Sequence, residues 1–133
     1  MREHQAPRAR DDDDRAAACL FAEEGARIVV ADIDSGAARD AVAQVREAGG
    51  EAMYTVGDVG LASDAERMVA DGLEAFGKVD ILINNAAVVQ PIGPTVTAMP
   101  VAWAAAFAVN VDAPFHFTRR SCLRCSTGAG VGS

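Results

Sequence analysis

The most constraining feature of the sequence is a regular alternation of short apolar runs and helical patterns across residues 15–120. The run 26–32 is apolar on both faces, which is typical of a buried parallel strand. The segments 52–56 and 79–84 also have the length and residue types of strands, and longer helical patterns separate the three. Strands joined through helices pair in parallel. The sequence therefore predicts an α/β fold with a doubly wound parallel sheet and helices on both faces.

The helical segments carry apolar faces at helical spacing. A short helix before residue 26 is expected to use an apolar stripe of Ala17, Leu20 and Phe21. Ser35 is expected to cap the next helix, and a capping box spans 63–66. A long apolar helix covers 101–120, with Pro114 expected to kink it. The core faces expected for the two middle helices are Ala38, Ala41, Val42 and Val45, then Ala65, Met68, Val69, Gly72, Leu73 and Phe76.

Charge and hydropathy exclude several classes of protein. The formal net charge of −7 argues against a nucleic-acid partner, because such a partner requires a basic surface. The longest apolar run, 101–109, is far shorter than the ~20 residues of a membrane-spanning helix. Residues 1–15 lack the apolar core of a secretory signal. We therefore expect a cytoplasmic protein with no membrane partner, whose cysteines are free thiols and form no metal site.

Acidic residues follow two of the expected strands. A carboxylate at Asp32 can accept hydrogen bonds from the adenosine ribose of a dinucleotide, and it would repel a 2′-phosphate, which favours NAD over NADP. The alternative is a strand-end acid that only caps the next turn. Asp58 follows the strand 52–56 and can meet the adenine amino group, or it can be a simple turn residue.

Amides mark two further positions. Asn84 and Asn85 close the strand 79–84, and the small Ala86 and Ala87 after them leave room for a ligand in a nucleotide cleft. A plain Asx turn is the alternative. Asn110 lies in the middle of an apolar helix, where a buried amide must find partners. It is either a helix-kink residue satisfied by a neighbouring carbonyl or a member of a proton relay.

Taken together, these motifs resemble the short-chain dehydrogenase/reductase family. Their order and spacing suit the family across 15–120, about four fifths of the chain, although Ala87 stands where the family usually has glycine. The matching stretches are Phe21-Ala22-Glu23-Glu24-Gly25-Ala26, Val29-Val30-Ala31-Asp32, Asp58-Val59, Val79-Asp80-Ile81-Leu82-Ile83-Asn84-Asn85-Ala86, Asn110-Val111 and Ala113-Pro114-Phe115.

The resemblance implies a Rossmann-type sheet and an NAD(P)-dependent oxidoreductase that moves a hydride between the nicotinamide and a small-molecule alcohol or ketone. It also implies a homo-oligomer, because in the family the helix at 101–120 packs against a partner subunit. The implied cofactor contacts are Asp32 on the ribose, Asp58 and Val59 at the adenine, and Asn84 and Ala86 at the cofactor cleft. Asn110 would be the asparagine of the catalytic Asn-Ser-Tyr-Lys set.

The sequence departs from the family pattern at both ends. The glycines of the Thr-Gly-x-x-x-Gly-x-Gly turn would fall at Arg8, Asp12 and Asp14, and the first strand would be 1–6, which has no strand pattern. The Tyr-x-x-x-Lys motif cannot form, because Tyr54 and Lys78 are the only tyrosine and the only lysine. We therefore expect a partial Rossmann domain that lacks its first strand and its C-terminal third.

This reading divides the chain into an atypical acidic N-terminal segment (1–14), a partial dinucleotide-binding domain (15–120) and a flexible tail (121–133). Acidic side chains in place of glycines repel the diphosphate and block its approach to the backbone, so NAD is expected to bind poorly. No turnover is expected from this chain alone. The alternative function is a non-catalytic Rossmann-like fragment that acts as a dimerisation module or binds adenosine weakly.

Overall fold

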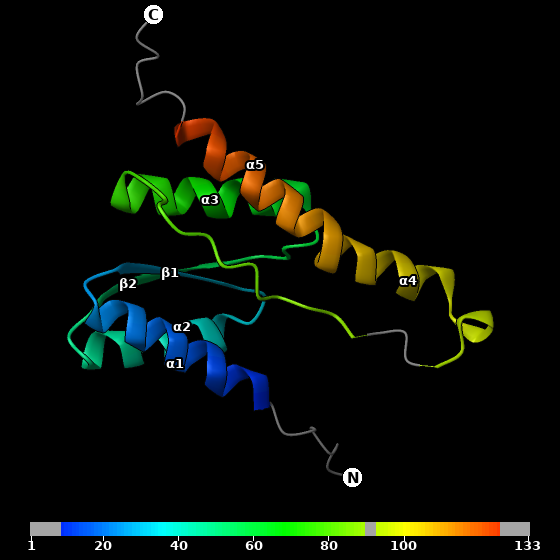
Figure 1. Cartoon of the computed structure of the whole chain (residues 1–133), viewed down its shortest axis with the longest axis horizontal. Helices are drawn as coiled ribbons and strands as arrows, with labels where there is room; N and C mark the ends of the chain where they lie inside the picture. The colour runs from blue at the N-terminus through cyan, green and yellow to red at the C-terminus, as the bar shows by residue number, and fades with distance from the viewer. Residues whose placement is uncertain (1–8, 90–92, 126–133) are drawn as a thin grey trace, which may run out of the picture.

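The computed structural model describes residues 9–89 and 93–125 (Figure 1). Two strands, β1 (Arg27–Asp32) and β2 (Glu51–Val56), pair in parallel from Arg27 opposite Glu51 to Asp32 opposite Val56. Helix α2 (Ser35–Glu47) crosses from β1 to β2, as the alternation in the sequence predicts. The parallel α/β architecture expected from the sequence is therefore confirmed for this part of the chain.

Helices cover both faces of this sheet, as Figure 1 shows. Helices α1 (Ala9–Glu23) and α2 lie together on one face, and both contact β1. Helix α3 (Ala62–Phe76) lies on the other face and packs against α5 (Ala113–Cys125). The result is a three-layer arrangement in which helices cover each face of the sheet.

A small apolar core joins α1, α2 and β2 on the first face. It consists of Ala22, Val42, Val45 and Ala52, with Ala18, Cys19, Ile28 and Val30 packed around it. The buried residues of α2 are the four predicted from helical spacing. The cap of α2 differs from the prediction, because Asp34 and not Ser35 accepts the backbone N–H groups of Gly36 and Ala37, at 2.8 and 3.2 Å.

The second core lies between α3, α5 and the loops at the sheet edge. Its buried residues are Ala65, Met68, Val69 and Phe117, and Val59, Leu73 and Leu82 pack against it. The predicted face of α3 is thus confirmed at its centre. The predicted capping box at 63–66 is wrong, because the helix already begins at Ala62 and its N-cap, Leu61, makes no side-chain hydrogen bond.

The segment 79–84 is not a strand, which corrects the sequence-based expectation. It is the continuation of the chain after α3, and Leu82 reaches the second core while Ile81 and Ile83 are 69% and 59% exposed. A strand exists only when a neighbour pairs with its backbone groups. In the Rossmann order that neighbour is the segment 1–6, which lies outside the described residues.

The long apolar helix predicted at 101–120 is broken by a π-helical turn. Helix α4 (Pro100–Phe107) continues through the turn η2 (Ala108–Asp112) into α5, and a short 3₁₀ turn, Thr95–Thr97, precedes it. The irregular turn includes Asn110, four residues before Pro114. A proline has no N–H to donate to the carbonyl four residues earlier, so the regular ladder is interrupted there. Within the described residues no helix is long and apolar enough to cross a bilayer.

Both outer helices extend beyond the expected domain limits. Helix α1 begins at Ala9, so the backbone of the acidic run 11–14 is helical. Helix α5 continues to Cys125, five residues past the expected end of the domain at residue 120. The remainder of the expected acidic segment and tail, residues 1–8 and 126–133, lies outside the described residues.

Candidate functional site

The end of β1 presents the carboxylate of Asp32. One of its oxygens, Oδ1, accepts a hydrogen bond from the backbone N–H of Asp34 at 2.8 Å. The backbone carbonyl of Asp32 accepts from the N–H of Gly57 at 3.0 Å, which ties the ends of the two strands together. Asp32 therefore stabilises the local turn with one oxygen, and Oδ2 has no hydrogen-bond partner among the described residues.

Asp58 organises the turn that follows β2. Its Oδ1 accepts from the backbone N–H of Gly60 at 2.8 Å, and its own N–H donates to Oδ2 of Asp64 at 2.8 Å. The N–H of Leu61 donates to the Asp58 carbonyl at 3.0 Å. The turn interpretation of Asp58 thus has a geometric basis, and the side chain is half-buried at the same sheet edge as Asp32.

A network around Arg67 holds this turn against α3. Its guanidinium donates to the Val56 carbonyl at 2.6 Å and lies 3.4 Å from Asp64 and 3.3 Å from Asp71. The hydroxyl of the buried Thr55 donates to Asp71 at 2.6 Å. Asp64 and Arg67 were not predicted from the sequence as site residues. Their signal is the i, i+3, i+7 spacing of Asp64, Arg67 and Asp71, which places the three on one helix face.

Asn110 joins the π turn to the chain that follows Asn84. Its Nδ2 donates to the Val88 carbonyl and its Oδ1 accepts from the Val88 N–H, both at 2.8 Å. A primary amide can pair with a peptide group in this two-bonded way because it carries both a donor and an acceptor. The structure thus gives Asn110 a partner on a distant loop and not the neighbouring carbonyl that one interpretation of the sequence expected.

These contacts bring most of the predicted site residues to one edge of the sheet. A Cβ on Gly60 would lie 3.4 Å from side-chain atoms of Ala108 and Val109, so the Asp58 turn lies against the π turn of Asn110. The Gly57–Asp32 hydrogen bond joins the Asp58 turn to Asp32. The remaining predicted residues lie in two different places. Asn84 and Ala86 are exposed on the segment before Val88, whereas Val59 packs on the second core.

The residues present fit one half of a dinucleotide better than the other. The edge formed by Asp32 and Asp58 offers carboxylate acceptors of the kind that bind an adenosine ribose and amino group. A diphosphate needs open backbone N–H groups at a glycine turn, but positions 12 and 14 are aspartates inside the helix α1. Tyr54 lies on β2, and Lys78 pairs with Asp80 at 2.9 Å, so they form no acid–base pair.

Comparison with known proteins decides the family. A family model described as Enoyl-(Acyl carrier protein) reductase matches residues 15–131. The chain belongs to the short-chain dehydrogenase/reductase family. The resemblance carried by the sequence motifs is therefore confirmed.

Curated relatives and solved structures agree with this assignment. An uncharacterised oxidoreductase of Thermotoga maritima is 40% identical over 105 residues, which are 79% of this chain and 41% of that protein. A sorbitol dehydrogenase of Cereibacter sphaeroides is 34% identical over 118 residues, covering 89% of this chain and 44% of that protein. A metagenomic short-chain oxidoreductase in complex with NADP superposes with a TM-score of 0.81 at 31% identity, over 86% of this chain and 52% of that one.

A further structure, NAD⁺-bound xylitol dehydrogenase, superposes with a TM-score of 0.80 at 32% identity, over 86% of this chain and 44% of that one. These neighbours confirm a partial Rossmann fold and an oxidoreductase family that uses nicotinamide cofactors. The chain spans about two fifths of the length of the curated relatives it matches.

Proposed function

We propose that this chain carries the adenosine-binding half of an NAD-dependent oxidoreductase whose substrate is a small-molecule alcohol or ketone. The observation that supports the proposal is the convergence of Asp32, Asp58 and Asn110 at the carboxyl edge of the parallel strands. Ligands of open α/β sheets bind in the crevice outside this edge. The relatives are oxidoreductases of the same family, which supports hydride transfer as the reaction class.

Asp32 favours NAD over NADP in this proposal. Its unpartnered oxygen is available to a ribose hydroxyl, and its negative charge opposes a 2′-phosphate. Asp58 serves the adenine, and Asn84 and Ala86 border the cleft. Asn110 acts by holding Val88, and hence the loop after Asn84, in place. With aspartates at the diphosphate position and no tyrosine–lysine pair, the chain alone is expected to turn over no substrate.

The proposal is tested with adenosine fragments, which avoid the diphosphate position. AMP is expected to bind about tenfold more tightly than 2′,5′-ADP, because the extra phosphate faces the Asp32 carboxylate. Asp32→Ala should abolish this preference, whereas the matched variant Asp40→Ala, which removes an exposed carboxylate from α2, should preserve it. Isothermal calorimetry measures each affinity, and NADH in the same series is expected to bind no more tightly than AMP.

Two results would contradict the proposal. Equal affinities of the unmodified chain for AMP and 2′,5′-ADP would remove the role of Asp32. Tight NADH binding together with reduction of NAD by an alcohol would show that the acidic helix does not obstruct the diphosphate and that the chain is itself an active enzyme.

A second candidate function, a dimerisation module, has its own observation. Exposed apolar side chains recur every four residues along α4, η2 and α5, and they are Trp103, Phe107, Val111 and Phe115, between 45% and 60% exposed. The rings of Trp103 and Phe107 contact each other with centroids 5.0 Å apart. An exposed apolar stripe of this kind is typical of a surface that another protein covers.

The dimer candidate predicts a concentration-dependent equilibrium. Sedimentation velocity should show a dimer at micromolar concentration, and Phe107→Ser should shift it to monomer because the change places a hydroxyl in the apolar contact. Leu20→Ser, at an exposed position of α1, is the matched control and should leave the dimer intact. A chain that remains monomeric at all concentrations would exclude this function.

A further inference from the structure

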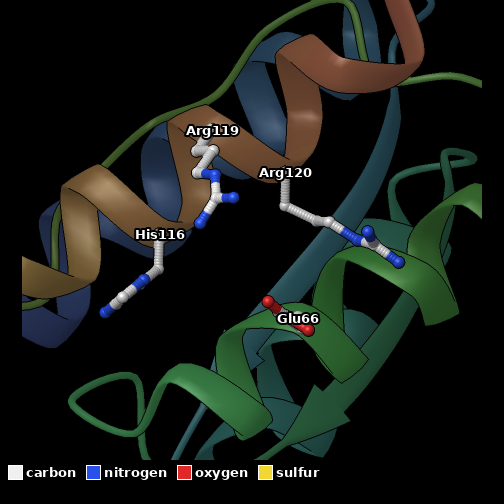
Figure 2. Close-up of a pocket in the computed structure, with 4 residues that line it drawn as sticks. All are labelled: Glu66, His116, Arg119 and Arg120. Atoms are coloured by element: carbon white, nitrogen blue, oxygen red, sulfur yellow. The ribbon is translucent and has the colours of Figure 1, made fainter.

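A small open pocket lies beside the contact between α3 and α5, away from the residues assigned to the cofactor. Its volume is about 50 Å³, and its lining residues are Glu66 on α3 and His116, Arg119 and Arg120 on α5. The three residues of α5 stand at i, i+3 and i+4, so they share one helix face. Figure 2 shows both arginine side chains leaving α5 toward α3, and the Glu66 carboxylate leaving α3 toward α5.

The two arginines of this pocket have no hydrogen-bond or ion-pair partner among the described residues. Arg27, Arg46 and Arg67 donate to the carbonyls of Phe76, Ala52 and Val56. Arg15 on α1 and Arg39 on α2, like the two pocket arginines, have no partner among the described residues. The carboxylate of Glu66 also has no ion-pair partner there, although it faces the same pocket. Arg119 and Arg120 are thus two unbonded guanidinium groups that line one pocket, in a chain whose net charge is −7.

We propose that this pocket binds a phosphate group, either free phosphate or the phosphate of a small molecule. A guanidinium presents a planar fork of donors that matches phosphate oxygens, and it keeps its charge at all accessible pH values. Arg119 and Arg120 supply two such forks from adjacent positions, and His116 adds a ring nitrogen at the rim. The pocket, of about 50 Å³, has room for a compact oxyanion such as a phosphate group.

Glu66 selects the form of the ligand. A carboxylate facing the pocket repels a fully ionised phosphate and accepts a hydrogen bond from a ligand hydroxyl. The pocket therefore favours a phosphate that carries an O–H, such as the monoanion, or one with a hydroxyl close to it. Glu66 also weakens the binding of anions that carry no O–H group. Such an anion cannot donate a hydrogen bond to the carboxylate and is repelled by its negative charge.

The test titrates the full chain with inorganic phosphate and follows binding by nuclear magnetic resonance at low ionic strength. Saturable binding in the millimolar range is expected, with shifts confined to α5 and the start of α3. Arg119→Gln with Arg120→Gln should weaken binding at least tenfold. The matched control, Arg15→Gln with Arg39→Gln, removes the same charge from α1 and α2 and should have little effect, because neither side chain has a bonded partner within the part of the chain that the structure describes. Glu66→Gln should tighten binding several-fold.

These variants keep the proposal falsifiable even if one of them folds poorly. The effect of Glu66→Gln has the opposite sign to that of the arginine changes, so a general loss of structure cannot imitate both results. Absence of saturable binding, equal losses in the pocket and control pairs, or weaker binding by Glu66→Gln would each overturn the proposal. None of these results bears on Asp32 and the AMP titration, so the two proposals can fail separately.

Discussion

Replacing Met68 by alanine is expected to lower the free energy of unfolding by about 2–5 kcal/mol. Met68 is 1% exposed and is among the largest fully buried side chains, at the centre of the core between α3 and α5. Its removal leaves a cavity in a contact that the neighbouring helices cannot close without moving. Because small domains are stable by only about 5–15 kcal/mol, a loss of this size is large. Urea denaturation followed by circular dichroism measures it.

Met99→Ala is the matched control for this prediction. Met99 is 64% exposed just before α4, so its truncation should change the unfolding free energy by less than about 0.5 kcal/mol. If the two methionine variants were equally stable, α3 and α5 would not be packed together as described. That result would also remove the structural basis of the phosphate pocket, which lies beside the same contact.

Helical periodicity predicted the parts of the fold that depend on local sequence. The buried face of α2 and the centre of the buried face of α3 follow from apolar residues at i, i+3, i+4 and i+7, because this spacing fixes which side of a helix is apolar. The strands β1 and β2 were within a residue of their expected starts. In these helices, the apolar residues lie on the face that packs against the rest of the protein, and local sequence alone identifies that face.

Elements that depend on partners distant in the sequence could not be predicted from local periodicity. The segment 79–84 has the residue types of a strand, but pairing requires a second backbone, and no local pattern supplies one. The observed N-cap of α2 is Asp34, one residue before the predicted Ser35. Sequence could not choose between them, since either side chain can accept hydrogen bonds from the first turn.

The candidate site shows the same division. Spacing and residue type predicted Asp32, Asp58 and Asn110 as site residues, and the family model over residues 15–131 confirmed the resemblance that these motifs carry. The pairing of the Asn110 amide with Val88, and the support of the Asp58 turn by Asp64 and Arg67, depend on contacts between separate elements. Such contacts are decided by tertiary packing, which the sequence of one chain does not display.

Helix α1 shows how packing can override apparent hydrophobicity. The expected stripe used Leu20 and Phe21, but both are exposed, and the small residues Ala18, Cys19 and Ala22 face the sheet instead. Small side chains let α1 approach the turn after α2 closely. A Cβ added at Gly50 in that turn would lie only 2.7 Å from the Ala22 Cβ. The closeness of this approach explains why the larger residues are turned outward.

Gly50→Ala is therefore expected to cost about 1–3 kcal/mol of stability through overpacking. The new Cβ would also lie 2.8 Å from Cγ1 and 3.1 Å from the carbonyl oxygen of Val45. Gly50 cannot move aside freely, because its N–H donates to that same carbonyl at 2.9 Å. Thermal and urea unfolding measure the loss. Gly72→Ala is the control, since its Cβ would meet only the Val29 side chain, at 3.3 Å or more, and alanine has the higher helix propensity.

A double-mutant cycle tests whether the loss of stability in Gly50→Ala comes from contact with α1. Ala22→Gly removes the Cβ that the new methyl would strike, so it should destabilise the Gly50→Ala chain less than it destabilises the unmodified chain. A coupling of this sign requires the C-terminal end of α1 to pack against the turn after α2, as the 2.7 Å approach to the Ala22 Cβ implies. If the two changes were additive, Ala22 would not contact this turn, and the outward orientation of Leu20 and Phe21 would need another explanation.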